Sequence, residues 1–294
     1  MKVTPEIQAL FDAHNTGRIS RRDFVKQAAI LLSGTMIVGA ALHDHEPDTV
    51  QAAPQATLAA TMGTNQDVKL VTKMIEFDSE GSKTPGYLAY PESGGPFPAV
   101  VVIQEWWGVQ EQIKGICDRY ALAGFDALAP DLYNGVVVPY HDTDAAGKEM
   151  NSLNFADAVS QNVRGAALFL KRNGAKAGIT GFCLGGVVSI LAAANIPEFA
   201  CATPFYGIPP ENVCKPADVK IPLQGHFALK DTWITPDAVD KFEAGLKEAG
   251  KNFEIFRYDA DHAFVNEQRA PVHDRQAAEL AWDRSVAFLK KHLA

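Results

Sequence analysis

Three residues able to carry out acyl transfer, Cys183, Asp231 and His262, follow one another along the chain. Cys183 is the centre of a Gly-x-Cys-x-Gly pattern (181–185) that follows a short apolar run and opens a second apolar run, 184–194. A strand that turns directly into a helix strains its apex residue and crowds the neighbours two positions away, so both must be glycine. The apex side chain then lies at a helix N-terminus, which favours a thiolate. The pattern predicts a nucleophile; the alternative is a small buried thiol.

Chemistry assigns the other roles. His262 is predicted to accept the thiol proton and later to protonate the leaving group, while Asp231 orients the imidazole and stabilises its charged form. The backbone N–H groups of Leu184 and Trp106 are predicted to form an oxyanion hole. His262 is preferred because it alone follows the last predicted strand; the other histidines in this part of the chain are His141, His226 and His273.

The elements that position these residues alternate between strand and helix. Apolar or alternating runs predict strands at 69–77, 86–90, 99–103, 125–129, 177–180, 200–206, 221–225 and 253–258. Helices are predicted at 109–123, 154–173, 184–194, 237–249 and 274–292, with 134–150 irregular. This order is typical of an α/β fold with a mostly parallel central sheet and helices on both faces. Glu105, Cys183, Asp231 and His262 then follow four different strands, at the edge where such sheets bind ligands.

Composition narrows the class of protein. The chain has 294 residues and a net charge of −8, with 47% hydrophobic and 21% charged residues, which suits one large α/β domain. The acidic balance argues against nucleic acid as a partner. Four cysteines at irregular spacing match no zinc pattern, and neither a metal nor a cofactor is expected. Cys201 and Cys214 leave two alternatives open, a disulfide or two reduced buried thiols.

The first sixty residues have the character of an export signal. Arg21 and Arg22 lie in the sequence Ser-Arg-Arg-Asp-Phe-Val-Lys, which matches a twin-arginine (Tat) signal, and the apolar run 28–42 follows. That run is shorter than the roughly 18–20 residues of a stable membrane span. We therefore predict a signal-bearing extension at 1–60, a linker at 61–67 and the α/β-hydrolase-fold domain at 68–294. The expected partner is the Tat machinery, and the expected location is the periplasm or cell envelope.

Four landmarks resemble the dienelactone hydrolase (carboxymethylenebutenolidase) family: Gln104–Gly108, Gly181–Gly186, His226–Asp231 and Ala260–Phe264. The resemblance covers about 68–294 and implies hydrolysis of a small ester or lactone through a thioester acyl-enzyme. It also implies that Glu105 contacts the resting cysteine and helps to generate the thiolate. From the residues alone, Glu105 is equally a buried acid paired with an arginine.

The chain departs from the family where a substrate carboxylate is bound. The family's arginine four residues after the catalytic histidine is Asn266 here, and 134–151 contains no arginine, so Arg269 is the nearest candidate replacement. We expect a preference for neutral esters, lactones or thioesters, because an amide gives an anion no charged fork. The candidate substrate-binding residues are Trp107, Tyr133, Phe264, Asn266 and Arg269. The alternative function is a catalytically retired hydrolase fold that binds a small molecule or a partner in the envelope.

Overall fold

The computed structural model describes residues 68–172 and 174–294 of the chain. The twin-arginine signal predicted at 1–60 and the linker lie outside these residues. Within the described part, no helix is both long and apolar enough to cross a lipid bilayer.

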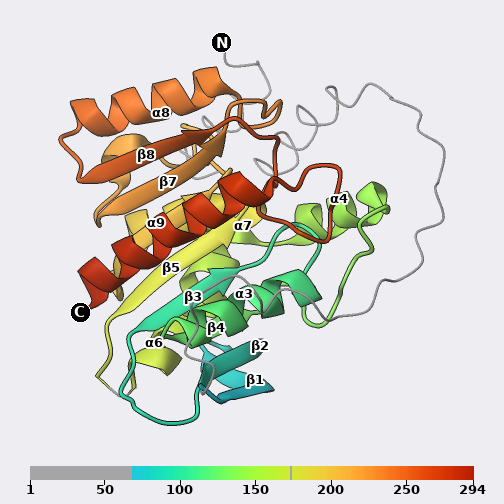
Figure 1. Ribbon diagram of the computed structural model, residues 1–294, viewed down its shortest axis with the longest axis vertical. Helices are drawn as coiled ribbons and strands as arrows, with labels where there is room; N and C mark the ends of the chain where they lie inside the picture. Colours follow the sequence, from blue (N-terminus) through green and yellow to red (C-terminus); the bar gives the residue numbers. More distant parts are fainter. Residues whose placement is uncertain (1–67, 173) are drawn as a thin grey trace, which may run out of the picture. The chain divides into compact units, whose positions relative to one another are not determined.

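The domain is built on an eight-stranded sheet with the order β1-β2-β4-β3-β5-β6-β7-β8 (Figure 1). β1 and β2 pair as an antiparallel hairpin, β2 pairs antiparallel with β4, and the remaining pairs are parallel. The strands are Leu70–Ser79, Ser82–Pro91, Ala99–Ile103, Asp126–Pro130, Ala177–Phe182, Phe199–Phe205, Leu223–Ala228 and Phe253–Tyr258. The predicted mostly parallel sheet is confirmed.

Helices cover both faces of this sheet. Val100 and Val102 of β3 pack in one apolar cluster with residues of α3 (Glu111–Leu122) and α9 (Arg275–Leu293). Val101 and Ile103 point the other way, into a second cluster. That cluster includes residues of α6 (Arg164–Lys171), α7 (Leu184–Asn195) and α8 (Pro236–Glu248). An all-apolar strand such as β3 is required because both of its faces are buried.

Two segments differ from the sequence prediction. The stretch 134–150 was expected to be irregular, but Thr143–Ser152 forms α4, capped by the Asp142 side chain on the Ala145 N–H. The sequence pattern missed it because only Ala146 of this helix is buried, so it has no apolar stripe. The long helix predicted at 154–173 begins as α5 (Phe155–Asp157), passes through a π-helical turn, η2 (Ala158–Val163), and continues as α6.

The turn between β5 and α7 explains the glycines around Cys183. A Cβ atom on Gly181 would come within 3.0 Å of the Gly185 carbonyl, and one on Gly185 within 3.0 Å of the Ile103 and Gln104 carbonyls. Backbone therefore occupies the space that a side chain would need. The predicted tight strand-to-helix turn is confirmed, and it holds α7 directly against β3 and β5.

The four cysteines are free thiols in the structure. Cys201 on β6 and Cys214 in the following loop are both buried, and the disulfide considered for them is not formed. Burial raises the pKa of both thiols to about 12, so they stay protonated near neutral pH. Cys183 is the one cysteine that is not fully buried.

We predict that Gly185→Ala destabilises the domain by about 1–3 kcal/mol or more, because its new methyl group overlaps two backbone carbonyls that cannot rotate away. Gly115→Ala in α3 is the matched control, since nothing lies within 4 Å of the added Cβ. Alanine should there stabilise the helix by about 0.5–1 kcal/mol. Urea unfolding of the two variants measures both effects. Equal stability of Gly185→Ala and the wild type would show that the turn is not tightly packed.

Candidate active site

The four predicted chemical residues come together at the carboxyl edge of the sheet. Glu105 lies two residues after β3, Cys183 directly after β5, Asp231 three residues after β7 and His262 four residues after β8. His226 does not join them: it lies inside β7, fully buried, with its ring nitrogens bonded to Tyr258 and Gln224. Parallel strands place all four segments on the same side because they end at the same edge.

Backbone strain is concentrated in this group of residues. Cys183 has φ +54°, Tyr206 after β6 has φ +35°, and Ala263 beside His262 has φ +64°. Residues other than glycine rarely occupy this left-handed region, and such strain is typical of sites where geometry is imposed for function. The Cys183 N–H is bonded to the Phe205 carbonyl, and its own carbonyl accepts the first bonds of α7. These bonds hold the thiol at the N-terminus of the helix.

A short hydrogen bond joins the acid and the histidine. His262 Nδ1 lies 2.7 Å from Asp231 Oδ2. The other carboxylate oxygen, Oδ1, accepts the backbone N–H groups of Trp233 at 2.8 Å and Ile234 at 2.9 Å. Asp231 is buried, so its rotamer is fixed by these three bonds. The imidazole is thereby fixed with Nδ1 toward the carboxylate and Nε2 free for chemistry.

The second ring nitrogen is buried but unpaired. His262 Nε2 has no hydrogen-bond partner among the described residues. Burial alone would lower the pKa of this imidazole, but the nearby Cys183 sulfur and the Asp231 carboxylate outweigh burial and raise the pKa of His262 to about 10. The structure therefore pairs a readily protonated imidazole with a sulfur atom. Such a pair favours a thiolate–imidazolium ion pair.

Glu105 is a buried acid held by two neutral donors. The Tyr206 hydroxyl donates to its Oε1 at 3.1 Å, and the Asn266 amide donates to its Oε2 at 2.9 Å. No hydrogen bond joins it to Cys183, and no ion pair joins it to an arginine of the described chain. Burial raises the pKa of Glu105, while Asn266, His262 and Arg269 work in the opposite direction. The carboxylate thus lies within electrostatic range of the catalytic candidates.

The predicted oxyanion donors lie at the same edge. Leu184 is the first residue of α7, and Trp106 lies in the turn after β3, where the Glu105 carbonyl accepts the Gly108 N–H at 3.3 Å. Neither the Leu184 nor the Trp106 N–H donates to a backbone carbonyl of residues 68–172 or 174–294. Two free N–H groups on either side of Cys183 are what a developing oxyanion requires.

Aromatic rings surround the histidine. The Trp233 ring is 52% exposed and stacks on the imidazole of His262 with centroids 5.5 Å apart. Trp106 packs edge-on against both Trp233 and Trp107, at 5.2 and 4.9 Å. Trp107 is buried, so Trp106 and Trp233 are the indoles that a ligand can reach. This side of the site favours flat apolar groups.

Two of the predicted substrate contacts are wrong. Phe264 and Asn266 are fully buried. Phe264 packs between Tyr206 and Tyr258, and the Asn266 amide is used by Glu105, so both side chains support the site from behind. Arg269 is partly exposed and lies 5.6 Å from the Trp107 ring, while Tyr133 borders a pocket. Asn266→Arg, which sequence reasoning favours as a gain of anion binding, would instead place a long cation in a closed space.

Sequence reasoning missed Tyr206 and Trp233. Tyr206 directly follows β6, so its position at the end of a parallel strand was a usable signal. Trp233 follows Asp231 by two residues, but only the loop conformation brings its ring over His262. Within the described chain, no group of three or more histidine, cysteine, aspartate or glutamate side chains could hold a metal ion.

Comparison with known proteins assigns the chain to a family. Residues 84–293 match the dienelactone hydrolase family. Protein usf of Aquifex pyrophilus is 38% identical over 75% of this chain and 99% of its own length. An Escherichia coli (strain K12) protein provisionally named a carboxymethylenebutenolidase is 32% identical over 82% of this chain and 94% of its own length.

Solved structures agree with this assignment. A Klebsiella pneumoniae protein provisionally named a dienelactone hydrolase has a TM-score of 0.69 and 32% identity, covering 76% of this chain and 99% of its own. A dienelactone hydrolase-like promiscuous phosphotriesterase from metagenomic libraries covers the same shares with a TM-score of 0.67 at 17% identity, which is a likeness of fold. The chain belongs to the dienelactone hydrolase family and is a hydrolase of the ester and lactone class.

Proposed function

We propose that the protein hydrolyses a small, uncharged ester, lactone or thioester through a cysteine nucleophile and a thioester acyl-enzyme. The observation that carries this proposal is the buried, unpaired Nε2 of His262 beside Cys183, on an imidazole fixed by Asp231 at 2.7 Å. An unpaired buried nitrogen costs stability, so it is retained where a reacting partner completes it.

The proposed reaction has two half-reactions. The Cys183 thiolate attacks the carbonyl carbon, and the oxyanion accepts hydrogen bonds from the Leu184 and Trp106 N–H groups. The tetrahedral intermediate collapses as protonated His262 gives its Nε2 proton to the leaving oxygen or sulfur, which leaves a thioester on Cys183. Neutral His262 then takes a proton from water, and the resulting hydroxide attacks the thioester. Collapse releases the acid and restores the thiolate–imidazolium pair.

Glu105 has a supporting electrostatic role in this proposal. Its buried carboxylate interacts favourably with protonated His262, because the imidazolium lowers the pKa of Glu105 and the coupling is mutual. Stabilising the imidazolium keeps the proton on nitrogen and the negative charge on sulfur. Tyr206 and Asn266 are positioning residues, since they hold both carboxylate oxygens.

The electrostatics favour an uncharged substrate. Asn266 is buried against Glu105, and the segment 134–151 contains no arginine. A carboxylate entering a partly buried site needs charge-assisted hydrogen bonds to replace its hydration. Arg269 is the remaining nearby guanidinium, and it lies over the face of Trp107.

A catalytically retired binding protein is the less favoured alternative. A retired site has no chemical reason to keep a thiol at a strained helix N-terminus, with φ +54°, beside an oriented histidine. Replacing Cys183 by an ordinary helix-capping residue with relaxed angles would relieve that strain.

We also propose that Arg21 and Arg22 direct export of the folded protein through the Tat machinery to the periplasm or cell envelope. The support is the sequence motif and the apolar run that follows it.

The nucleophile is tested by substitution. Cys183→Ala should lower kcat/KM for ethyl butanoate at least about a thousandfold, because the acyl-enzyme cannot form. Intact-mass measurement after brief exposure to p-nitrophenyl acetate should show an acetyl adduct on the wild type and none on Cys183→Ala. Cys214→Ala is the matched control and should keep the adduct, since that thiol is buried in a loop away from the site. Activity of Cys183→Ala near the wild-type level would overturn the mechanism.

The pH dependence tests His262. Its pKa of about 10 predicts that kcat/KM for ethyl butanoate falls as pH rises through 10, because the proton needed by the leaving group is lost. Asp231→Asn removes a charge that raises this pKa, so the alkaline fall should move to lower pH. Asp261→Asn is the control: this neighbouring carboxylate is exposed and screened by water, and the fall should stay in place. An unmoved profile in Asp231→Asn contradicts the assignment.

Export is tested in cells. Replacing both Arg21 and Arg22 by lysine should retain the protein in the cytoplasm, because the Tat receptor recognises the arginine pair itself. Arg18→Lys is the control and should leave export unchanged. Fractionation followed by immunoblotting measures the distribution. An envelope location that survives the double replacement refutes the Tat proposal.

A further inference from the structure

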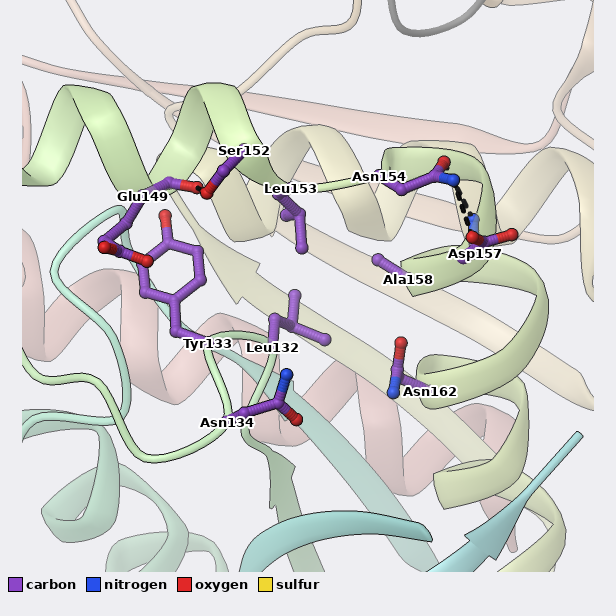
Figure 2. A pocket seen from close by; sticks show the side chains of 10 residues that line it. All are labelled: Leu132, Tyr133, Asn134, Glu149, Ser152, Leu153, Asn154, Asp157, Ala158 and Asn162. Carbon is purple, nitrogen blue, oxygen red and sulfur yellow. Dashed lines mark hydrogen bonds between the residues drawn. The ribbon is translucent and has the colours of Figure 1, made fainter. Parts of the chain in front are cut away.

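A pocket of about 230 Å³ opens beside the segment that follows β4 (Figure 2). Tyr133 and Asn134 line it from that segment, Glu149 and Ser152 from α4, and Asn162 from η2. Pockets for whole drug-sized ligands start at about 300 Å³, so this one suits a single small group of a larger molecule. None of Cys183, Asp231 and His262 lines it.

Tyr133 supplies a donor without an acceptor. Its side chain is only 5% exposed, and its hydroxyl has no hydrogen-bond partner among the described residues. Burial raises the pKa of Tyr133, and the negative charges of Cys183 and Glu149 add to this effect, so the hydroxyl stays protonated. A buried unsatisfied hydroxyl costs stability unless a ligand pairs with it.

The remaining lining defines the chemistry of the occupant. No lysine, arginine or histidine is among the lining residues, whereas two are acids, Glu149 and Asp157. Asp157 already accepts hydrogen bonds from the Asn154 and Gln161 amides. Amides and hydroxyls are then available beside apolar Leu132 and Leu153 (Figure 2). This mixture pairs with hydroxyl groups on a short carbon chain and repels a carboxylate.

The strand order shows which part of the substrate reaches this pocket. His262 follows β8 and Tyr133 follows β4, so the two lie on opposite sides of Cys183, which follows β5. The leaving group must lie on the His262 side, because that imidazole protonates it. The acyl chain therefore extends toward β4. Tyr133 also shares an apolar cluster with Leu184, the residue after the nucleophile.

We propose that this pocket is an acyl-group subsite for a short, uncharged chain carrying hydroxyl groups, with the Tyr133 hydroxyl as its main hydrogen-bond donor. The substrate class is then the esters or lactones of small hydroxylated acids. This rests on the proposed hydrolysis at Cys183.

Four ethyl esters with the same four-carbon acyl backbone test the subsite: ethyl butanoate, ethyl 3,4-dihydroxybutanoate, monoethyl succinate and ethyl 4-(trimethylammonio)butanoate. The wild type should have its highest kcat/KM on the dihydroxy ester and its lowest on the succinate. In Tyr133→Phe, the ratio of kcat/KM for the dihydroxy ester to that for ethyl butanoate should fall about fivefold, as expected for one lost hydrogen bond.

Two controls accompany this variant. Tyr90→Phe removes a hydroxyl on β2 outside the pocket lining and should leave the ratio unchanged. Thermal unfolding should show a Tm for Tyr133→Phe equal to or above that of the wild type, because the removed hydroxyl has no partner in the free protein. A lower Tm would mean that the hydroxyl is already satisfied, which contradicts the proposal.

Three kinetic results would overturn it. An unchanged ratio in Tyr133→Phe removes the proposed donor. A preference for the trimethylammonio ester that is lost in Glu149→Gln makes the pocket a cation site. Selectivity that appears only between glyceryl butanoate and propyl butanoate places the hydroxyls in the leaving group instead.

Direct binding separates this proposal from the proposed hydrolysis. Saturation-transfer NMR with 3,4-dihydroxybutanamide and butanamide requires no turnover. Tyr133-dependent binding of the dihydroxy amide without any esterase activity would reject the hydrolysis and support the pocket. Esterase activity with no binding difference between the two amides, or between wild type and Tyr133→Phe, would do the reverse.

Discussion

The site depends on how closely the β5–α7 turn packs against β3. Gly181 and Gly185 leave room for backbone carbonyls where side chains would stand, and this lets Cys183 adopt φ +54°. The thiol then projects at the N-terminus of α7, where free N–H groups and the helix dipole favour negative charge. The same packing sets Leu184 beside the turn that carries Glu105 and Trp106. One steric constraint thus positions the nucleophile and both oxyanion donors.

Charge in this site is balanced by neutral donors on one side and by a single cation on the other. Asp231 and Glu105 are both buried, and their hydrogen bonds come from backbone N–H groups, Tyr206 and Asn266. Because these donors carry no charge, the field of both acids falls on His262. Together with the Cys183 sulfur, that field explains why burial does not keep the imidazole neutral.

Fold and triad were predictable because each rests on local pattern. Uninterrupted apolar runs such as β3 identify buried strands, and chemistry-bearing residues directly after them converge at one edge. Side-chain exposure was not predictable in the same way. Asn266 and Phe264 were expected to face the substrate, but the loop after β8 turns back at Ala263, φ +64°, and directs both inward. Trp233 and α4 were missed because neither is marked by apolar periodicity.

The burial of Asn266 changes the meaning of a missing arginine. An arginine at this position could form an ion pair with Glu105, and much of the carboxylate's charge would then be neutralised locally. An amide holds the same oxygen at 2.9 Å but leaves the charge uncompensated. In this chain the substitution therefore acts on two properties at once. It removes a cation from the substrate side, and it leaves Glu105 free to stabilise protonated His262, which in turn keeps Cys183 as the thiolate.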